Sequence, residues 1–85
     1  MKDMIHIIIV DDHRLFRMGL RNTFQFAYPD ISVIGEADSG EALFELSSLK
    51  AADLVLLDIN LPGMGGAAVA RRLRNDYPAL KILAI

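Results

Sequence analysis

Cysteine is absent from the 85 residues of the sequence. Its absence excludes a disulfide framework, a thiol nucleophile and a thiolate metal site. A long hydrophobic run is lacking as well, because the apolar stretch 4–10 contains His6 and is followed at once by two aspartates. This stretch is too short to span a membrane, and it has no small-residue cleavage site that would mark a targeting segment. We therefore expect a soluble, cytoplasmic protein without membrane contact.

Charge of one sign is not massed anywhere in the chain. The formal net charge is −2, and the arginines at 71, 72 and 74 share one expected helix with Asp76. This pattern lacks the broad basic surface that is typical of nucleic-acid binding. With 53% hydrophobic residues, a chain of 85 residues can form one small core and not two.

Strand-like and helix-like patterns alternate along the sequence. Short apolar or β-branched runs predict strands at 5–10, 31–37, 54–57 and 81–85, and apolar residues at helical spacing predict helices at 14–27, 40–49 and 67–75. Asp38 or Ser39 is expected to cap the second helix. The positions expected to face inward are Phe16, Leu20, Phe24 and Ala27, then Ala42, Leu43, Leu46 and Leu49, then Val69, Ala70 and Leu73. The alternation predicts an α/β fold with a parallel sheet and helices on both faces.

Carboxylates follow two of the expected strands directly. Asp11 and Asp12 end the first strand, and Asp58 ends the run 54–57. If these strands are neighbours about 5 Å apart, the acids meet at the sheet edge where open parallel sheets bind ligands. Their mutual repulsion is relieved by a hard divalent cation, and oxygen ligands suit Mg²⁺. The competing interpretation is that Asp58 caps a loop and that the other two cap the first helix.

Other polar and sulfur-containing residues near these acids are expected to be structural. His13 begins the first helix without a serine or cysteine partner, so we interpret it as a loop or cap residue. His6 lies inside a strand and is interpreted as a packed core or edge residue. Met64 is expected to pack within the loop that follows Asp58.

Together these features resemble the receiver domain of bacterial two-component response regulators. The resemblance rests on Asp11-Asp12 after an apolar strand and on Leu-Leu-Asp58 followed by Ile-Asn-Leu-Pro62-Gly63-Met-Gly-Gly. Residues 10–20 are most similar to the LuxR/NarL-type subfamily, in which a receiver precedes a helix-turn-helix. The resemblance implies a doubly wound, flavodoxin-like sheet with strand order 2-1-3-4-5.

The resemblance also implies a function for the acidic residues. Asp58 would accept a phosphoryl group from the phosphohistidine of a histidine kinase. Asp12 and Asp58 would bind Mg²⁺ directly, Asn60 through its backbone carbonyl and Asp11 through water. The chain would then be a phosphoacceptor signalling domain and not an enzyme in its own right. Its output would be transcription regulation, with DNA bound only by a helix-turn-helix domain that is not in this chain.

Some residues of the family pattern are missing. Family members carry a serine or threonine after strand four and a lysine after strand five, both in contact with the phosphoryl group. The sequence stops at Ile85, so we expect residues 1–85 to be an incomplete receiver domain, truncated within strand four, with only the first four strands and three helices. An uncovered sheet face and an edge strand would result, and we expect residues 1–85 alone either to fold poorly in dilute solution or to self-associate through strand four and that face.

Two other functions fit the residues less well. An aspartate-nucleophile phosphatase of the haloacid dehalogenase type needs a general acid two residues after its nucleophile, and Asn60 in that position cannot donate a proton in that role. A plain nucleotide-binding module needs a glycine-rich turn after the first strand. Residues 11–18 contain no glycine, and their two acids would repel a pyrophosphate.

Overall fold

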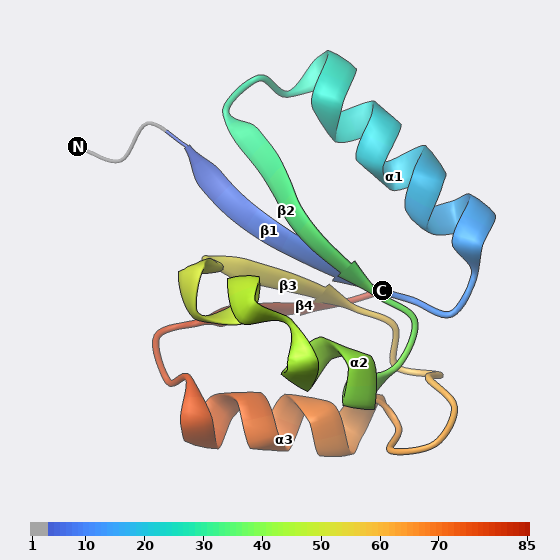
Figure 1. The fold of residues 1–85 in the computed structure, drawn as a ribbon, viewed down its shortest axis with the longest axis vertical. Helices are drawn as coiled ribbons and strands as arrows, with labels where there is room; N and C mark the ends of the chain where they lie inside the picture. Colours follow the sequence, from blue (N-terminus) through green and yellow to red (C-terminus); the bar gives the residue numbers. More distant parts are fainter. Residues whose placement is uncertain (1–3) are drawn as a thin grey trace.

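Strands and helices alternate along the chain in the computed structural model, which describes residues 4–85 (Figure 1). The elements in chain order are β1 (Ile5–Val10), α1 (Arg14–Ala27), β2 (Ile31–Ala37), α2 (Gly40–Glu45), the 3₁₀ helix η1 (Ser47–Ala51), β3 (Leu54–Leu57), α3 (Gly66–Asp76) and β4 (Lys81–Ala84). The predicted α/β fold is therefore confirmed.

The strands form one parallel sheet in the order β2-β1-β3-β4. This is the order that the resembled fold gives its first four strands. In the register of the central pair, Val10 of β1 lies opposite Leu57 of β3. The residues that follow these two, Asp11 and Asp58, therefore leave the sheet side by side at its carboxyl edge.

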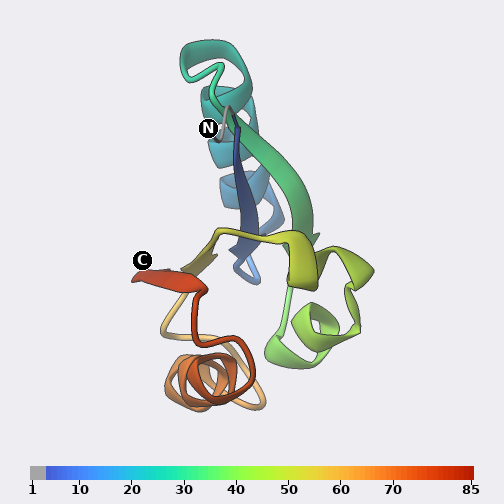
Figure 2. The ribbon, with the colours of Figure 1, turned by 90° about the vertical axis from the view of Figure 1, so that its left-hand side faces the viewer.

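Helices cover both faces of the sheet: α1 lies on one face, and α2 and α3 lie on the other (Figures 1 and 2). Side chains of β1 alternate between the two faces, as the pleat of a strand requires. Ile8 and Val10 join the larger core with Leu43, Val69 and Leu73 of α2 and α3. The opposite face carries a smaller core of Ile7, Ile9 and Leu56, against which α1 packs.

The inward face predicted for α1 is only half correct. Leu20 and Phe24 pack against the smaller core, but Phe16 is 48% exposed and Ala27 is also exposed. No residue of α1, all of which lies within the described part of the chain, is fully buried. The fully buried residues of the core on this face are Ile7, Ile9 and Leu56, and apolar contact with them reaches only part of the 14-residue helix.

The helix predicted at 40–49 is divided. α2 ends at Glu45, Leu46 adopts an extended backbone with φ −72° and ψ 122°, and η1 follows. Two serines at 47–48 explain the break, since serine favours caps and turns over helix interiors. The capping residue is Ser39, whose hydroxyl oxygen accepts a hydrogen bond from the Ala42 N–H at 3.0 Å. Leu43 and Leu49 of the predicted face are nevertheless buried.

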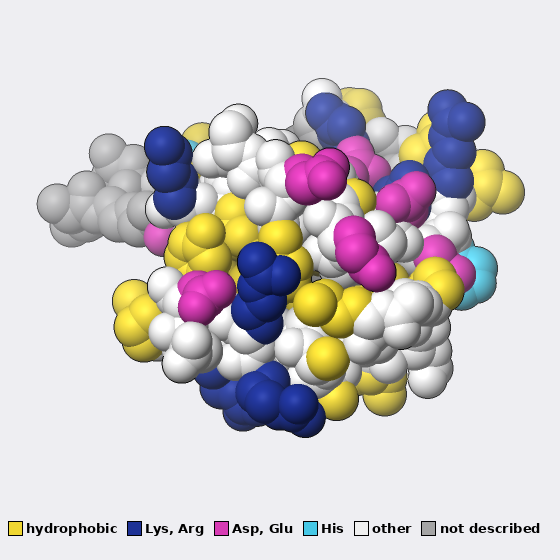
Figure 3. Space-filling view, turned by 60° about the horizontal axis from the view of Figure 1, so that its bottom comes forward, with side chains coloured by type: hydrophobic (Ala, Val, Ile, Leu, Met, Phe, Trp, Pro, Cys, Tyr) yellow, Lys and Arg dark blue, Asp and Glu magenta, His cyan; other side chains and the backbone are white. Residues whose placement is uncertain are grey.

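The third helix closely follows its prediction. α3 is one residue longer at each end than the expected 67–75, and Val69 and Leu73 are fully buried while Ala70 is partly buried. Figure 3 shows that acidic and basic side chains both occur on the face that α2 and α3 present. In residues 4–85, no helix has the length and apolar character needed to cross a membrane.

Candidate functional site

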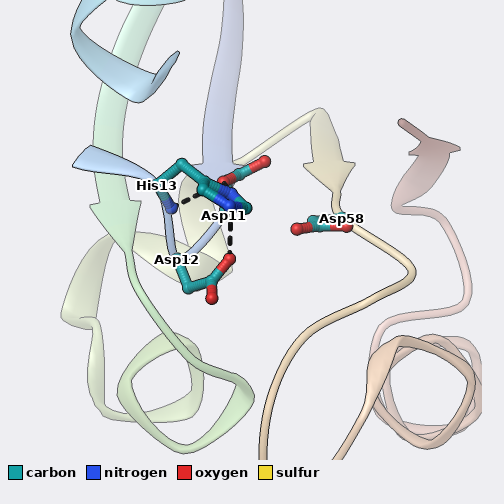
Figure 4. Close-up of side chains that lie close together, drawn as sticks. All are labelled: Asp11, Asp12, His13 and Asp58. Carbon is teal, nitrogen blue, oxygen red and sulfur yellow. Dashed lines mark hydrogen bonds and ion pairs between the residues drawn. The ribbon is translucent and has the colours of Figure 1, made fainter. Parts of the chain in front are cut away.

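The predicted acidic residues come together at the carboxyl edge of the sheet (Figure 4). Asp11 and Asp12 follow β1, Asp58 follows β3, and His13 lies beside them. One ligand atom from each of these four side chains lies within 4.8 Å of the others. Asp11 is 4% exposed and Asp58 is 7% exposed, whereas Asp12 and His13 are open to solvent. The site therefore has a buried floor and an exposed rim.

Backbone hydrogen bonds hold the two buried aspartates of this site, Asp11 and Asp58, in place. The Asp58 N–H donates to the Val10 carbonyl at 2.9 Å, and the Asp11 N–H donates to the Ala37 carbonyl at 3.0 Å. These bonds continue the sheet by one residue beyond β1 and β3. Both buried carboxylates thus stand on rigid strand ends and not on mobile loops.

The side chain of Asp58 also shapes the loop that follows it. Its Oδ1 accepts a hydrogen bond from the N–H of Asn60 at 2.9 Å, which is the two-residue turn that aspartate favours. The loop-capping interpretation of Asp58 is therefore correct. The same carboxylate also belongs to the acidic cluster. Asn60 itself is exposed in this turn.

Glycines hold the same loop close to Asp58. Gly63 has φ 69° and Gly65 has φ 81°, in the left-handed region that glycine occupies at no steric cost. Gly66, the first residue of α3, packs directly on backbone, and a Cβ there would lie 2.5 Å from the Cα of Ile59. The start of α3 therefore rests on the chain segment that leaves Asp58.

A pair of arginines braces the other side of the site. Arg17 of α1 donates to the backbone carbonyl of Asp11 and pairs with Glu36 of β2, with 3.3 Å between Nε and Oε1. Arg21 contacts the other oxygen of Glu36 at 2.8 Å. Sequence reasoning missed this brace. Its signal was present, because basic residues four apart share one face of a helix and Glu36 lies near the carboxyl end of the neighbouring strand.

The interpretation of His13 as a loop or cap residue is correct only for its backbone. His13 is the N-cap of α1, although its side chain makes no capping hydrogen bond within residues 4–85. Its ring Nδ1 instead lies 2.9 Å from Asp11 Oδ1 and 3.1 Å from Asp12 Oδ1 (Figure 4). The sequence signal for this ring contact was the position of His13 directly after Asp11 and Asp12.

The remaining interpretations agree with the structure. His6 lies in β1, where its backbone N–H donates to Asp53 Oδ2 at 2.7 Å and its ring Nδ1 lies 3.6 Å from the same oxygen. This contact lies at the amino end of the central strand β1, where the His6 side chain is partly exposed, away from the acids that follow Val10. Met64 is partly buried and packs against the larger core.

The acids raise the pKa of His13 above its ordinary value of 6.5, through the hydrogen bond to Asp11 and then through the negative charge of Asp12. The protonated ring is favoured in the folded state, so its contribution to stability is fully present below pH 6.5 and is lost as the pH rises through the raised pKa. We expect an NMR titration to give His13 a midpoint above 6.5. Asp11→Asn should move the midpoint down. An unchanged midpoint in that variant would show that Asp11 is not the cause.

A sequence model of the family described as the response regulator receiver domain matches residues 7–85. The chain belongs to this family. Receiver domains are the signalling domains of two-component systems, so the resemblance stated from the motifs is confirmed.

Individual relatives of this receiver domain agree with the family match. The chain is 44% identical over 69 residues to the nitrate/nitrite response regulator protein NarL of Escherichia coli K12, covering 81% of this chain and 32% of NarL. It is 39% identical over 83 residues to the response regulator GacA of Pseudomonas viridiflava, covering 96% of this chain and 38% of GacA. The chain thus spans about a third of the length of these relatives.

Solved structures of receiver domains have the same fold. The signal receiver domain of a response regulator NarL from Mycobacterium tuberculosis superposes with a TM-score of 0.84 at 35% identity, covering 96% of this chain and 65% of that one. The NarL-type subfamily suggested by residues 10–20 is therefore confirmed by sequence and structure together.

The donor set of this receiver domain suits a hard divalent cation. Asp11, Asp12 and Asp58 supply carboxylate oxygens, which are the ligands that Mg²⁺ prefers. Ligands bound to Mg²⁺ at about 2.1 Å can lie at most about 4.2 Å apart. The 4.8 Å within which the ligand atoms of the cluster lie, that of His13 included, is close to this limit.

Proposed function

We propose that Asp58 accepts a phosphoryl group from the phosphohistidine of a sensor histidine kinase in a Mg²⁺-dependent reaction. The observation that carries this proposal is the position of Asp58, which is 7% exposed at the end of central strand β3 with its carboxylate among those of Asp11 and Asp12. Membership of the receiver family supports the same role. The transfer forms a bond between an Asp58 oxygen and phosphorus and breaks the nitrogen–phosphorus bond, whose electron pair stays with the imidazole of the kinase.

Four residues would hold the cation in this proposal. Asp12 and Asp58 would bind Mg²⁺ directly, Asn60 through its backbone carbonyl, and Asp11 through a water molecule. The bound cation would neutralise the phosphoryl oxygens and orient them for in-line transfer. The chain itself keeps Asp58 fixed through the backbone bond to Val10 and the side-chain bond to the Asn60 N–H.

We propose that the output is transcription regulation, exerted by a DNA-binding domain outside these 85 residues. A relative from Brevibacillus brevis, 34% identical over 84 residues, is named transcriptional regulatory protein DegU. The chain covers 35% of DegU, which leaves room for an output domain in that protein. A cytoplasmic location and the absence of independent enzyme activity remain predictions.

The cation site is tested by titrating the chain with Mg²⁺ and measuring binding by calorimetry. We expect Asp12→Ala to weaken binding by roughly 10-fold to 100-fold or more, because it removes a direct ligand. Asp30→Ala is the matched control, since Asp30 is exposed and lies in the turn between α1 and β2. If Asp12→Ala and Asp58→Asn both bind Mg²⁺ as tightly as the parent, the proposed site is wrong.

We further propose that the 85-residue chain self-associates through β4 and the apolar face beside it. β4 is an edge strand within the described sheet, Leu83 is 53% exposed and Ile85 is 40% exposed. Edge strands with exposed apolar side chains recruit other strands. We expect sedimentation to show concentration-dependent dimers or larger species, and Leu83→Glu to reduce them more than Leu15→Glu on α1. A monodisperse monomer at all concentrations would contradict this.

A further inference from the structure

Arg17 fixes the backbone at the point where the chain leaves β1 and enters the acidic site. Its guanidinium donates a hydrogen bond to the Asp11 carbonyl and pairs with Glu36 of β2, with 3.3 Å between Nε and Oε1. The Asp11 N–H donates to the carbonyl of Ala37 at 3.0 Å, and Ala37 follows Glu36 in β2. Asp11 is therefore held at both of its backbone groups, and both contacts lead back to the same end of β2.

The contact with Arg17 sets the direction in which the chain continues to Asp12. The Asp11 carbonyl belongs to the planar peptide unit that also contains the Asp12 nitrogen, so a bond to that carbonyl limits rotation of the whole unit. Asp12 follows β1, whereas Asp58 follows β3. The separation of the Asp12 and Asp58 carboxylates therefore depends on the orientation of the peptide that Arg17 holds.

The charge of Arg17 is offset where it lies. By itself a guanidinium near the acidic site would compete with a cation, and the Arg17 side chain is only 15% exposed, so solvent screens its charge weakly. The Glu36 carboxylate, 21% exposed, offsets that charge. Arg21 pairs with the same carboxylate at 2.8 Å, but its side chain is 57% exposed, and within residues 4–85 its hydrogen bond goes to Glu36. Arg17 thus adds a fixed hydrogen bond to the site, whereas Arg21 adds only charge.

The contact of Arg17 with the acidic loop gives this residue a role in cation binding. We propose that Arg17 is a positioning residue, which holds the peptide between Asp11 and Asp12 in the orientation that lets Asp12 and Asp58 share one Mg²⁺. Glu36 keeps the guanidinium in place and offsets its charge. The inference rests on the proposed function in one respect, namely that these acids bind Mg²⁺. Residues that orient metal ligands without touching the metal typically change metal affinity about 10-fold to 100-fold when they are replaced.

Mg²⁺ titrations of the 85-residue chain, followed by calorimetry, compare Arg17→Met with Arg21→Met. Each variant removes one positive charge from the same carboxylate, and the loss of charge alone strengthens cation binding. We expect Arg17→Met to weaken Mg²⁺ binding roughly tenfold, because the Asp11 carbonyl loses its partner. Arg21→Met should bind Mg²⁺ as tightly as the parent or slightly more tightly.

NMR spectra separate positioning from a general loss of structure. In Arg17→Met without Mg²⁺, we expect the amide signal of Asp12 to move and broaden, because the freed peptide samples more than one orientation. The amide signals of Leu43 and Leu73 in the larger core should stay in place. Saturating Mg²⁺ should return the Asp12 signal to its position in the Mg²⁺-bound parent. Displaced core signals that saturating Mg²⁺ does not restore would show a merely structural role and would overturn the inference.

Two results of the titrations also overturn the inference. Parent-like Mg²⁺ affinity in Arg17→Met, or equal weakening in Arg17→Met and Arg21→Met, would show that Arg17 does not orient the acidic loop, and the proposed function would stand. Failure of the parent to bind Mg²⁺ would overturn both.

A second variant carries the test if Arg17→Met does not fold. Arg17→Lys keeps the charge, but its single ammonium lacks the planar fork by which the guanidinium reaches Asp11 and Glu36 together. Weaker Mg²⁺ binding by Arg17→Lys would then support the inference, and parent-like binding would overturn it.

Discussion

Replacement of Asp58 by asparagine is expected to abolish phosphorylation of a protein that contains these 85 residues. The amide is neutral and is a poor nucleophile, yet its oxygen can still accept the hydrogen bond from the Asn60 N–H. The loop should therefore keep its conformation while the chemistry is lost. Incubation with Mg²⁺ and a small acyl phosphate, followed by intact mass spectrometry, should show a base-labile phosphoryl adduct on the parent and none on the variant.

The control for this experiment is Asp30→Asn, which changes an exposed aspartate outside the acidic cluster and should be phosphorylated like the parent. An adduct that persists on Asp58→Asn would place the acceptor elsewhere, most plausibly on Asp11 or Asp12. Omission of Mg²⁺ should suppress the adduct on the parent, because the cation neutralises the phosphoryl oxygens.

Gly66→Ala is expected to have the largest effect on stability. Its Cβ would lie 2.5 Å from Ile59 Cα, 2.8 Å from the Ile59 carbonyl oxygen and 2.9 Å from the Asp58 carbonyl oxygen. These contacts are all with backbone, so the strain cannot be relieved by turning a side chain. Overpacking of this kind costs about 3 kcal/mol or more, out of a typical total of about 5–15 kcal/mol. Thermal melts should show a strongly lowered Tm, and Mg²⁺ binding should weaken because Asp58 is displaced.

Gly19→Ala provides the matched comparison. Gly19 lies inside α1, and within residues 4–85 a Cβ there meets open space. The same substitution should therefore stabilise the chain by about 0.5–1 kcal/mol, since alanine is a better helix former than glycine. If both variants melt like the parent, the close packing of α3 on the segment after Asp58 is wrong.

Strand positions could be predicted well because each strand is a short apolar run with turn residues on both sides. The same runs place Asp11 and Asp58 at strand ends, and parallel pairing then brings them together. The order of the strands could not be predicted from these patterns and followed from the family resemblance. Periodicity describes which residues share a face, and it carries no information on which strands become neighbours.

The sequence did not reveal which side chains of different helices and strands contact one another. Helical spacing suggested that Phe16 and Ala27 face inward, but their burial depends on how much apolar sheet lies opposite. The position of the His13 ring depends on the direction of the chain as it leaves β1. The contact of Arg17 with Asp11 and Glu36 joins three different segments, and a pattern within one segment cannot report it.

The brace around Glu36 connects the acidic site to α1 and β2. Arg17 links the acidic loop to β2 through one carboxylate, and Arg21 shares that carboxylate. Loss of Glu36 alone would leave two like charges side by side next to the Asp11 loop, and loss of Arg17 alone would release the Asp11 carbonyl. A substitution at Arg17 or Glu36 therefore reaches the acidic site through this shared contact, although neither residue belongs to the acidic cluster.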